Sequence, residues 1–556
     1  MSNATLERPR PRGRGAPASA EAAPRRRRSG WWLLLAPILA FDVVLFLTPL
    51  GKLVGASFAD NAYQRVLEDP LVMRALVNTL TISLASTIVT VVLGYIIAMV
   101  LWRAGNVTRV ILFAVVLLPF WTGILVKDFA WAVLLQDNGI VNAFLQGIGL
   151  TGAPIPLLHN RFAVIVGMVH CLLPYAVFPI FSSLTSIDDR LGLAARSLGA
   201  REGSVFRRIT LPLSMPGISA AGLLVFIIST GFFITPVVMG GPGDMMIANQ
   251  IDYYARQLTD FSGAAALAVI LTVMVSILVA NMKTTNPQHR LLALLSIPAF
   301  LFLVIPTAIV VPVALNDSRY ITFPPEGISF AAVAGFFADR AWTSALTASL
   351  QSAAIAVVIG VLLGATAAIG LHGRKFPGQP AVVGLILAPM IVPTVVLALA
   401  FYQFFISIGM VGSIVPIGLA HAVIATPYVY LTTRASLAGL NPALVRSAQS
   451  LGAGPLSVLR HVYLPIILPG LISGALFAFS VSIDETVMSL FMQSPGATTL
   501  PVKMFTDIQF NLTPKIAVSS ALLVSVATIG LLLQVLFVLK RRSSTRMLPL
   551  AVSAQT

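Results

Sequence analysis

Twelve long apolar runs constrain this chain more than any other feature of its sequence. Each is long enough to cross a bilayer as a helix, which takes about 20 apolar residues. They lie at about 32–51, 77–101, 108–134, 162–184, 216–239, 263–282, 291–314, 343–371, 379–407, 411–432, 466–490 and 515–539. With 57% hydrophobic and only 10% charged residues, the chain cannot cover the surface of an ordinary soluble protein. We therefore expect an all-α polytopic membrane protein in contact with the lipid bilayer.

The basic residues lie beside these runs. The formal net charge is +16, and eight arginines fall within the first 30 residues. Lys and Arg also gather in every second loop, around residues 103–109, 190–208, 283–290, 372–375, 434–461 and 540–546. Because positively charged loops stay in the cytoplasm, this alternation predicts a multi-pass protein of the cell (inner) membrane with both termini cytoplasmic. No nucleic-acid partner is expected, since no basic face with interleaved aromatics occurs.

A hydrophilic segment, KTTNPQHR at residues 283–290, divides the runs into six and six. The first run follows Arg25–Arg28 and imitates a secretory signal, but at about 20 residues it is longer than a signal core of roughly 7–15. It is therefore expected to be a retained span. The predicted parts are a disordered basic cytoplasmic tail (1–30), two membrane domains of six helices each (31–284 and 285–543), and a cytoplasmic tail (544–556).

One polar segment occurs twice, after the fourth run of each half. RSLGAREGSVFRRITLPLSMPG (196–217) and QSLGAGPLSVLRHVYLPIILPG (449–470) align at a spacing of 253 residues, and the match continues from Pro174 and Pro427 to Gly243 and Gly496. Since each half has an even number of runs, both copies face the cytoplasm. The halves are predicted to be parallel repeats, related by a pseudo-twofold axis along the membrane normal.

Local rules predict two short helices in each copy. In the first, Asp188 or Asp189 caps the start and Gly199 supplies a left-handed turn after the end. A second short helix over residues 203–209 is expected to stop before the next span, because Pro212 and Pro216 follow. In the second copy, Asn441-Pro442 starts the helix and Gly452 breaks it. The alternative is an amphipathic helix that lies on the lipid headgroups.

These segments resemble the EAA signature of membrane subunits of binding-protein-dependent ABC importers. That signature is E-A-A, three residues, Gly, nine residues, Ile, one residue and Leu-Pro. The first copy has Leu193-Ala194-Ala195, Gly199, Ile209 and Leu211-Pro212; the second has Arg446-Ser447-Ala448, Gly452, Val462 and Leu464-Pro465. Both copies lack the Glu of the family, and the second also lacks one Ala.

The resemblance covers nearly the whole chain and implies a type I ABC importer fold, with two permease subunits fused. In that family the segment is the coupling helix, which inserts into a groove of the cytoplasmic ATPase subunit. The implied partners are two copies of that ATPase and an extracytoplasmic solute-binding protein. The implied coupling residues are Ala194, Ala195, Ser197, Leu198, Gly199, Ala200, Leu211 and Pro212, and Ala448, Ser450, Leu451, Gly452, Ala453, Leu464 and Pro465.

The chain shows no signature of an enzyme. No G-x-x-x-x-G-K-[ST] motif occurs, and neither a metal-spaced His/Cys cluster nor a nucleophilic triad can be identified. No cofactor is expected in this chain. ATP and magnesium are expected on the partner ATPase.

Two acids distinguish the halves. When FIISTGFFIT (226–235) is aligned with FSVSIDETVM (479–488), Asp484 stands opposite Gly231 and Glu485 opposite Phe232. An ionised side chain inside a span costs roughly 2.5–3.5 kcal/mol on insertion scales, so such acids are candidates for function. We predict that Asp484 or Glu485 borders the substrate path. The alternative is a solvated acid at the outer end of a helix.

The segments around these acids resemble the spermidine/putrescine subfamily of permeases. They are SVSIDETVMSLFMQSPGATTLPVKMF (480–505), STGFFITPVVMGGPG (229–243) and LLPFWTGILVKDFAW (117–131). The resemblance implies a polyamine substrate, which carboxylates and aromatic faces both attract. Trp121, Phe232, Phe233 and Tyr402 are candidates for an aromatic wall, the alternative being packing or lipid contact. Asp42 is a further candidate for substrate contact, or else faces a polar group of a neighbouring helix.

Other functions stay open. The Gly231 and Phe232 pair departs from the subfamily, so another small solute, such as an aminophosphonate, iron or thiamine, is an alternative cargo. An ion-coupled secondary transporter with parallel repeats predicts buried charge relays in both halves and no docking loop. A non-transporting scaffold or receptor does not account for the repeat.

Overall fold

The computed structural model describes residues 33–281, 312–316, 327–510, 513–526 and 529. Within them the regular structure is helical, apart from one isolated bridge between Asn316 and Ile328. Seven of the described helices are long and apolar enough to cross a membrane, and one bent helix pair raises this number to eight. The predicted run at 291–314 and the end of the run at 515–539 lie largely outside the described residues.

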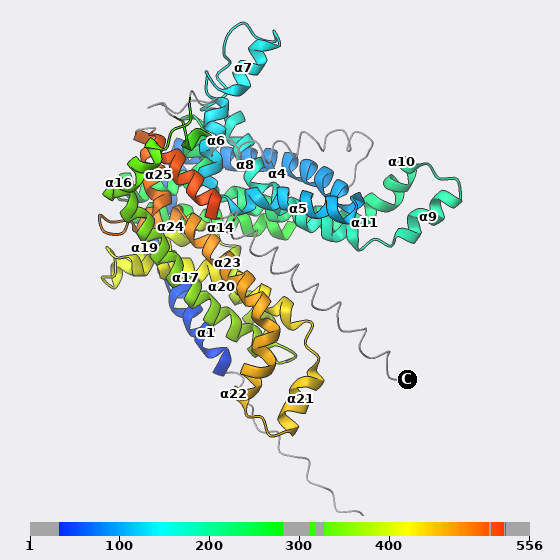
Figure 1. Ribbon diagram of the computed structural model, residues 1–556. Helices are drawn as coiled ribbons and strands as arrows, with labels where there is room; N and C mark the ends of the chain where they lie inside the picture. Colours follow the sequence, from blue (N-terminus) through cyan, green and yellow to red (C-terminus); the bar gives the residue numbers. More distant parts are fainter. Residues whose placement is uncertain (1–32, 282–311, 317–326, 511–512, 527–528, 530–556) are drawn as a thin grey trace, which may run out of the picture.

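The elements follow the same order in both halves (Figure 1). After α1 (Ala36–Asp42), η2 (Val43–Leu47), α2 (Thr48–Ala56) and α3 (Ala62–Glu68), the first half has α4 (Pro70–Arg103), α5 (Asn106–Trp121), α6 (Ile124–Leu135), α7 (Ile140–Gly147), α8 (Arg161–Thr185), α9 (Asp189–Ser197), α10 (Glu202–Val205), η3 (Phe206–Thr210), α11 (Leu211–Thr230), α12 (Ile234–Met239), α13 (Ile247–Asp252), η4 (Tyr253–Gln257) and α14 (Phe261–Asn281). The second has α16 (Ala331–Ala338), α17 (Arg340–Leu371), α18 (Gln379–Leu387), η5 (Ala388–Met390), α19 (Thr394–Ser407), α20 (Ile414–Leu437), α21 (Pro442–Ser450), α22 (Pro455–Val458), η6 (Leu459–Tyr463), α23 (Leu464–Asp484), α24 (Val487–Met492) and α25 (Leu500–Phe510).

The helix boundaries confirm the internal repeat. From α8 to α12 each element begins 253 residues before its counterpart, and from α4 to α6 the spacing between counterparts is 270 residues. The first long helix of each half even begins with the same cap: Asp69 accepts a hydrogen bond from the Leu71 N–H at 2.8 Å, and Asp339 from the Ala341 N–H at 2.9 Å. The two halves are therefore copies of one architecture.

Three long helices form the centre of each half. In the first, α4, α8 and α11 pack on one another, and in the second α17, α20 and α23 do so. Small residues allow the close approach: a Cβ on Gly94 would lie 2.7 Å from Ala176 Cβ, and a Cβ on Gly364 would lie 2.8 Å from Val429 Cβ. Membrane helices pack in this way because lipid supplies no hydrophobic force between them.

The first helix of the chain packs on the second half. Helix α1 contacts α17 and α18, and α2 contacts α19 (Figure 1). Leu35 and Ile38 are buried against Ala367 and Tyr430 of the second half. On the same side Lys52 Nζ donates a hydrogen bond to Ser407 Oγ at 2.6 Å.

Four predicted spans are interrupted where a straight helix was expected. The run 108–134 divides between α5 and α6, and the run 379–407 bends by 95° between Met390 and Thr394. The runs 216–239 and 466–490 end early, at Thr230 and Asp484, and a short helix follows each. Gly123 and Pro393 immediately precede α6 and α19 with extended backbone, so both residues start new helices instead of continuing old ones.

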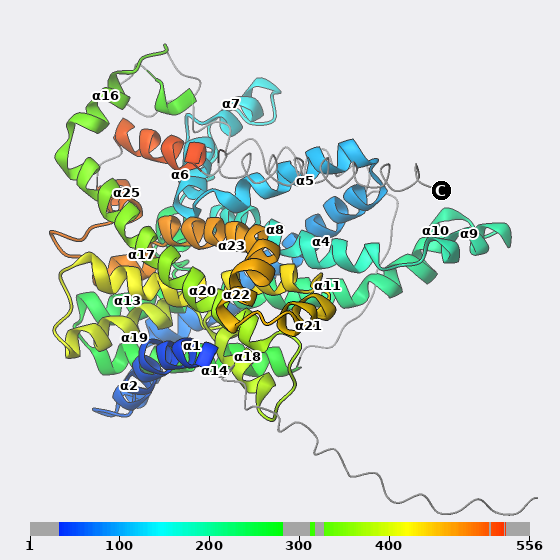
Figure 2. The same ribbon diagram turned by 60° about the horizontal axis from the view of Figure 1, so that its bottom comes forward.

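The repeated polar segments form short helices at the ends of their halves (Figures 1 and 2). Asp188, and not Asp189, is the residue that precedes α9, and its carboxylate accepts from the Arg190 N–H at 2.9 Å. Asn441 accepts from the Ala443 N–H at 2.9 Å in the second copy. Gly199 and Gly452 have φ of +81° and +84°, which confirms the predicted left-handed turns.

The expectation that prolines stop the second short helix was wrong. Helices α10 and α11 form one span, Glu202–Thr230, and α22 and α23 form another, Pro455–Asp484. A π-helical turn lies between the parts of each span, η3 before Pro212 and η6 before Pro465. The π turn widens the backbone just before a residue that has no N–H to donate, so the helix passes the proline without ending.

A candidate substrate cavity between the two halves

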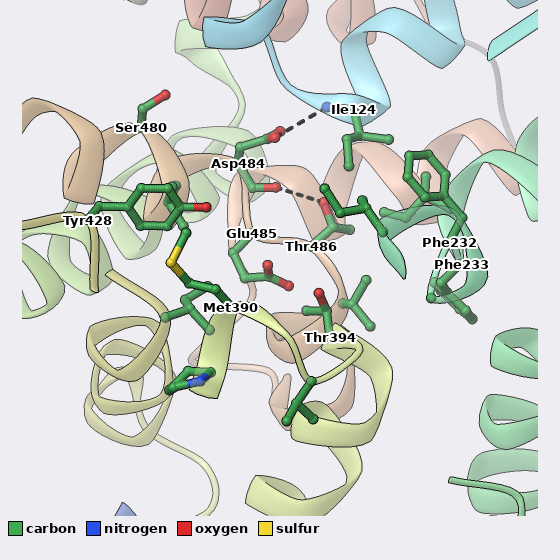
Figure 3. A pocket seen from close by; sticks show the side chains of 18 of the residues that line it. Ile124, Phe232, Phe233, Met390, Thr394, Tyr428, Ser480, Asp484, Glu485 and Thr486 are labelled. Atoms are coloured by element: carbon green, nitrogen blue, oxygen red, sulfur yellow. Dashed lines mark hydrogen bonds between the residues drawn. The ribbon is translucent and has the colours of Figure 1, made fainter. Parts of the chain in front are cut away.

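A cavity of about 260 Å³ lies where the two halves meet (Figure 3). The first half contributes the junction between α11 and α12, together with α6 and α8, and the second half contributes η5, α19, α20 and the junction between α23 and α24. The lining residues are Ile124, Tyr175, Ile228, Gly231, Phe232, Phe233, Ile234, Pro389, Met390, Val392, Thr394, Ile424, Tyr428, Phe477, Ser480, Val481, Asp484, Glu485, Thr486 and Val487.

The lining consists largely of repeat-related pairs. Tyr175 and Tyr428 face the cavity from α8 and α20, and the ends of α11 and α23 contribute Gly231 and Asp484. Both acids of the lining, Asp484 and Glu485, come from the second half. The cavity is therefore symmetric in backbone but polarised in charge.

The amides at two helix starts hold the acids in place. Asp484 Oδ2 accepts from the N–H of Ile124, the first residue of α6, at 3.3 Å. Glu485 Oε1 accepts from the N–H of Met488, near the start of α24, at 2.9 Å. Unpaired N–H groups and the helix dipole both favour an anion there. Figure 3 shows Glu485 pointing into the space beside Met390 and Thr394.

The contact between Asp484 and α6 depends on a missing side chain. A Cβ placed on Gly123 would overlap Asp484 Oδ1, so no larger residue fits there while Asp484 keeps its position. The repeat-related contact has the opposite composition: a Cβ on Gly231 would lie 3.0 Å from Pro393 Cβ. Each half thus places a glycine against the bulkier residue of the other half.

Aromatic side chains form part of the wall. Tyr428 stacks on Phe477 with ring centroids 6.1 Å apart, and Phe232 and Phe233 line the first-half side. Tyr402 lies elsewhere and packs on Phe261 at 5.9 Å. The side chain of Trp121, at the end of α5, is outside the described part of the structure. The two phenylalanine candidates thus border the cavity together with both acids, and Tyr402 does not.

Asp42 is not among the residues that line the cavity. It is buried in α1 at 2% exposure, and its Oδ2 has no hydrogen-bond partner among the described residues. The structure therefore does not bring Asp42 together with Asp484 and Glu485.

A buried polar group behind the first-half wall was missed by the sequence reasoning. Lys127 and Asp128, both in α6, are buried, and Asp128 Oδ2 accepts from Thr235 Oγ1 at 2.7 Å. Trp131 Nε1 donates to His170 Nδ1 at 3.0 Å between α6 and α8. The signal was present, since a Lys-Asp pair inside an apolar run is itself a mark of function.

The chain was compared with known families and proteins. Residues 90–291 and 360–545 match the family described as "binding-protein-dependent transport system inner membrane component". The spermidine/putrescine transport system permease protein PotB of Escherichia coli K12 is 34% identical over 252 residues, which cover 45% of this chain and 91% of that protein. The putrescine transport system permease protein PotI of the same organism is 32% identical over 258 residues, covering 45% of this chain and 91% of PotI.

Among solved structures, a bacterial ABC transporter involved in the import of the acidic polysaccharide alginate matches with a TM-score of 0.41 and 20% identity. The match covers 45% of this chain and 93% of that one. The relatives are thus covered almost completely by less than half of this chain, and the family domain occurs twice. A multi-pass inner-membrane protein of the transport type accounts for these matches and for the apolar helices. The chain belongs to the family of binding-protein-dependent transport system inner membrane components, with two family domains in one polypeptide.

Proposed function

We propose that this chain is the permease of an ATP-driven polyamine importer, with both permease units, residues 31–284 and 285–543, in one polypeptide. The observation that carries the proposal is the cavity between the halves, where Asp484 and Glu485 lie beside Tyr175, Tyr428 and Phe232. Carboxylates and aromatic faces both attract ammonium groups. The names of the relatives PotB and PotI, which are spermidine/putrescine and putrescine permeases, point to the same cargo.

Two copies of a cytoplasmic ATPase bind the two short-helix segments in this proposal. The supporting feature is a pair of exposed apolar side chains at repeat-related positions: Leu198 and Leu451 are each 88% exposed. Each follows a short helix and precedes the left-handed glycine, so the two copies present the same shape. The coupling residues are those of the two signature copies, from Ala194 to Pro212 and from Ala448 to Pro465.

The energy source and the cargo receptor lie in other chains. ATP and magnesium bind to the ATPase, and an extracytoplasmic solute-binding protein delivers the polyamine at the opposite end of the permease. Both termini and both coupling segments are cytoplasmic. ATP binding closes the two ATPase subunits, moves the coupling segments together, and rotates the halves about the cavity.

Reconstituted uptake tests this function. The chain, its ATPase and its binding protein are placed in liposomes, and uptake of labelled putrescine and spermidine is measured with and without ATP. Asp484→Asn with Glu485→Gln is expected to reduce uptake strongly while the ATPase still co-purifies. Uptake driven by an ion gradient without ATP would indicate a secondary transporter instead. A binding protein that holds an aminophosphonate, iron or thiamine but no polyamine would contradict the cargo.

A further inference from the structure

A second cavity, of about 530 Å³, lies beside the first coupling segment, away from the site between the halves. It is bounded by the end of α4, the start of α5, the loop after α8, and helices α9 and α10 with η3. The lining residues are Trp102, Arg103, Arg109, Thr185, Ile187, Asp188, Gly192, Leu193, Arg196, Glu202, Val205, Phe206, Ile209 and Thr210.

Three arginines and two acids line this cavity, and both acids are already engaged. Glu202 forms an ion pair with Arg196 at 2.8 Å. The carboxylate of Asp188 caps α9 by accepting from the Arg190 N–H. Arg103 forms no ion pair or hydrogen bond with any described residue, so its charge is not compensated by a direct partner.

Arg109 adds a second guanidinium that has no acid partner in the described chain. It donates from Nε and Nη2 to the carbonyl oxygens of Leu101, Trp102 and Ala104, at 2.9, 3.0 and 2.9 Å. These bonds fix the planar group at the end of α4, while neutral carbonyls leave its charge in place. Two fixed or adjacent guanidinium groups at the mouth of one cavity form a receptor for a compact, multiply charged oxyanion.

The cavity also has the position of a lipid-headgroup site. Helix α4 is a long apolar span that ends at Arg103, and Trp102 stands one residue before that end. Tryptophan is enriched at the level of the lipid headgroups. Ile187, Leu193 and Phe206 add apolar wall to the same cavity. Basic pockets of this kind on the cytoplasmic side of membrane proteins bind anionic headgroups.

The second half does not repeat this arrangement. At the spacing of 270 residues that relates α4 to α17, Gly373 stands in place of Arg103 and Gln379 in place of Arg109. Arg374, nearby, donates to the Gly370 carbonyl at 2.7 Å. A ligand of the first cavity would therefore act on one coupling segment and not on its twin.

We propose that this cavity binds a phosphoryl anion, through Arg103 and Arg109, and that the bound group braces α9 against the end of α4. The chemistry is shared by the headgroup of an anionic phospholipid and by free inorganic phosphate. The first coupling segment is then held by a ligand that the second does not need, which makes communication with the ATPase sensitive to the phosphoryl source.

The experiment compares the full chain in nanodiscs of phosphatidylcholine alone with nanodiscs that also contain phosphatidylglycerol, and measures retained lipid by native mass spectrometry. Arg103→Gln is expected to weaken phosphatidylglycerol retention by about tenfold, because one charge-assisted contact is lost. Arg103→Lys is expected to restore part of it. Arg190→Gln, in α9 but outside the cavity, is the matched control and is expected to retain lipid as the unchanged chain does.

A third arm adds inorganic phosphate to the phosphatidylcholine nanodiscs, and thermal unfolding checks that each variant is folded. Phosphate that raises the unfolding temperature of the unchanged chain, but not of Arg103→Gln, would identify free phosphate as the source. Equal lipid retention by Arg103→Gln and the unchanged chain, with no response to phosphate, overturns the proposal. Equal losses for Arg103→Gln and Arg190→Gln also overturn it, since they would show only a general effect of surface charge. Loss of ATPase binding by Arg103→Gln without any change in lipid or phosphate binding would assign the cavity to the partner protein and overturn it too.

Discussion

Asp484 at the end of α23 lies directly against Gly123 at the start of α6, across the boundary between the two halves. Its carboxylate accepts from the Ile124 N–H only because residue 123 has no side chain. The acid that polarises the cavity is therefore positioned by the half that does not carry it.

Gly123→Ala is expected to displace Asp484 from α6 and to raise the KM for polyamine uptake by about tenfold, since a hydrogen bond to a charged group is lost. Uptake kinetics in proteoliposomes measure the effect. Gly384→Ala in α18, where a Cβ meets nothing within 4 Å, is the matched control. In an Asp484→Ala background the alanine at 123 is expected to have no further effect. An additional loss there would show that Gly123 serves packing alone.

Gly199→Val and Gly452→Val are expected to weaken ATPase binding, because φ of +81° and +84° is costly for a residue with a side chain. The strain is about 1–2 kcal/mol at each position, enough to change the direction of the chain after α9 or α21. Co-purification with the ATPase measures the loss. Gly454→Ala is the control, since Gly454 has φ of −68° and an added Cβ meets nothing. Normal ATPase binding by both valine variants would contradict the docking role of these segments.

Leu198→Ser and Leu451→Ser are expected to reduce ATPase affinity without lowering the thermal stability of the permease alone. Both side chains are 88% exposed, so the fold gains little from their burial, whereas a partner groove would bury them fully. Burying a leucine side chain is worth about 1.5–3 kcal/mol, which corresponds to a change in Kd of roughly tenfold or more. Binding assays on the single and double variants measure it. A drop in unfolding temperature equal to the loss of binding would mean that the leucines stabilise the permease itself.

Stability is expected to depend on pH through Asp339, which precedes α17. The hydrogen bond that Lys515 Nζ donates at 2.6 Å lowers the pKa of Asp339, and the Ala341 N–H adds to this. A lowered pKa stabilises the fold above the usual carboxyl value of about 3.9, and this contribution is lost as pH falls through the lowered pKa. Thermal unfolding from neutral to acidic pH checks it. Lys515→Met is expected to unfold at a lower temperature near pH 7 and to match the unchanged chain at the acidic end. A constant difference between the two at every pH would contradict the ion pair as its cause.

Local signals made much of the fold predictable. Apolar length gave the approximate positions of most membrane helices. The Gly199 and Gly452 turns followed from the rule that a left-handed residue after a helix end is usually glycine. The asymmetry of Asp484 and Gly231 was visible because an internal repeat supplies its own comparison: a charge in one copy and none in the other stands out without any second sequence.

What could not be predicted depends on contacts between distant segments. Whether an apolar run stays straight at Gly123 or Pro393 is decided by what packs against the break, and here Asp484 and Gly231 do so. The π turn before Pro212 was unexpected because proline rules describe an α-helix, and a wider turn escapes them. Lys127 and Asp128 were overlooked because they lie within a segment whose resemblance to permeases had already been given a meaning.

Helix α1 crosses to the far half, where Leu35 and Ile38 are buried beside Ala367 and Tyr430. A gene split between the halves would therefore still yield two products that recognise each other, since the amino-terminal helix of one completes the hydrophobic interior of the other. Fusion in such a molecule adds equal stoichiometry and simultaneous synthesis to an association that the fold already encodes. Each fragment made alone would leave an apolar surface open to the lipid, and only co-expression would restore the pair.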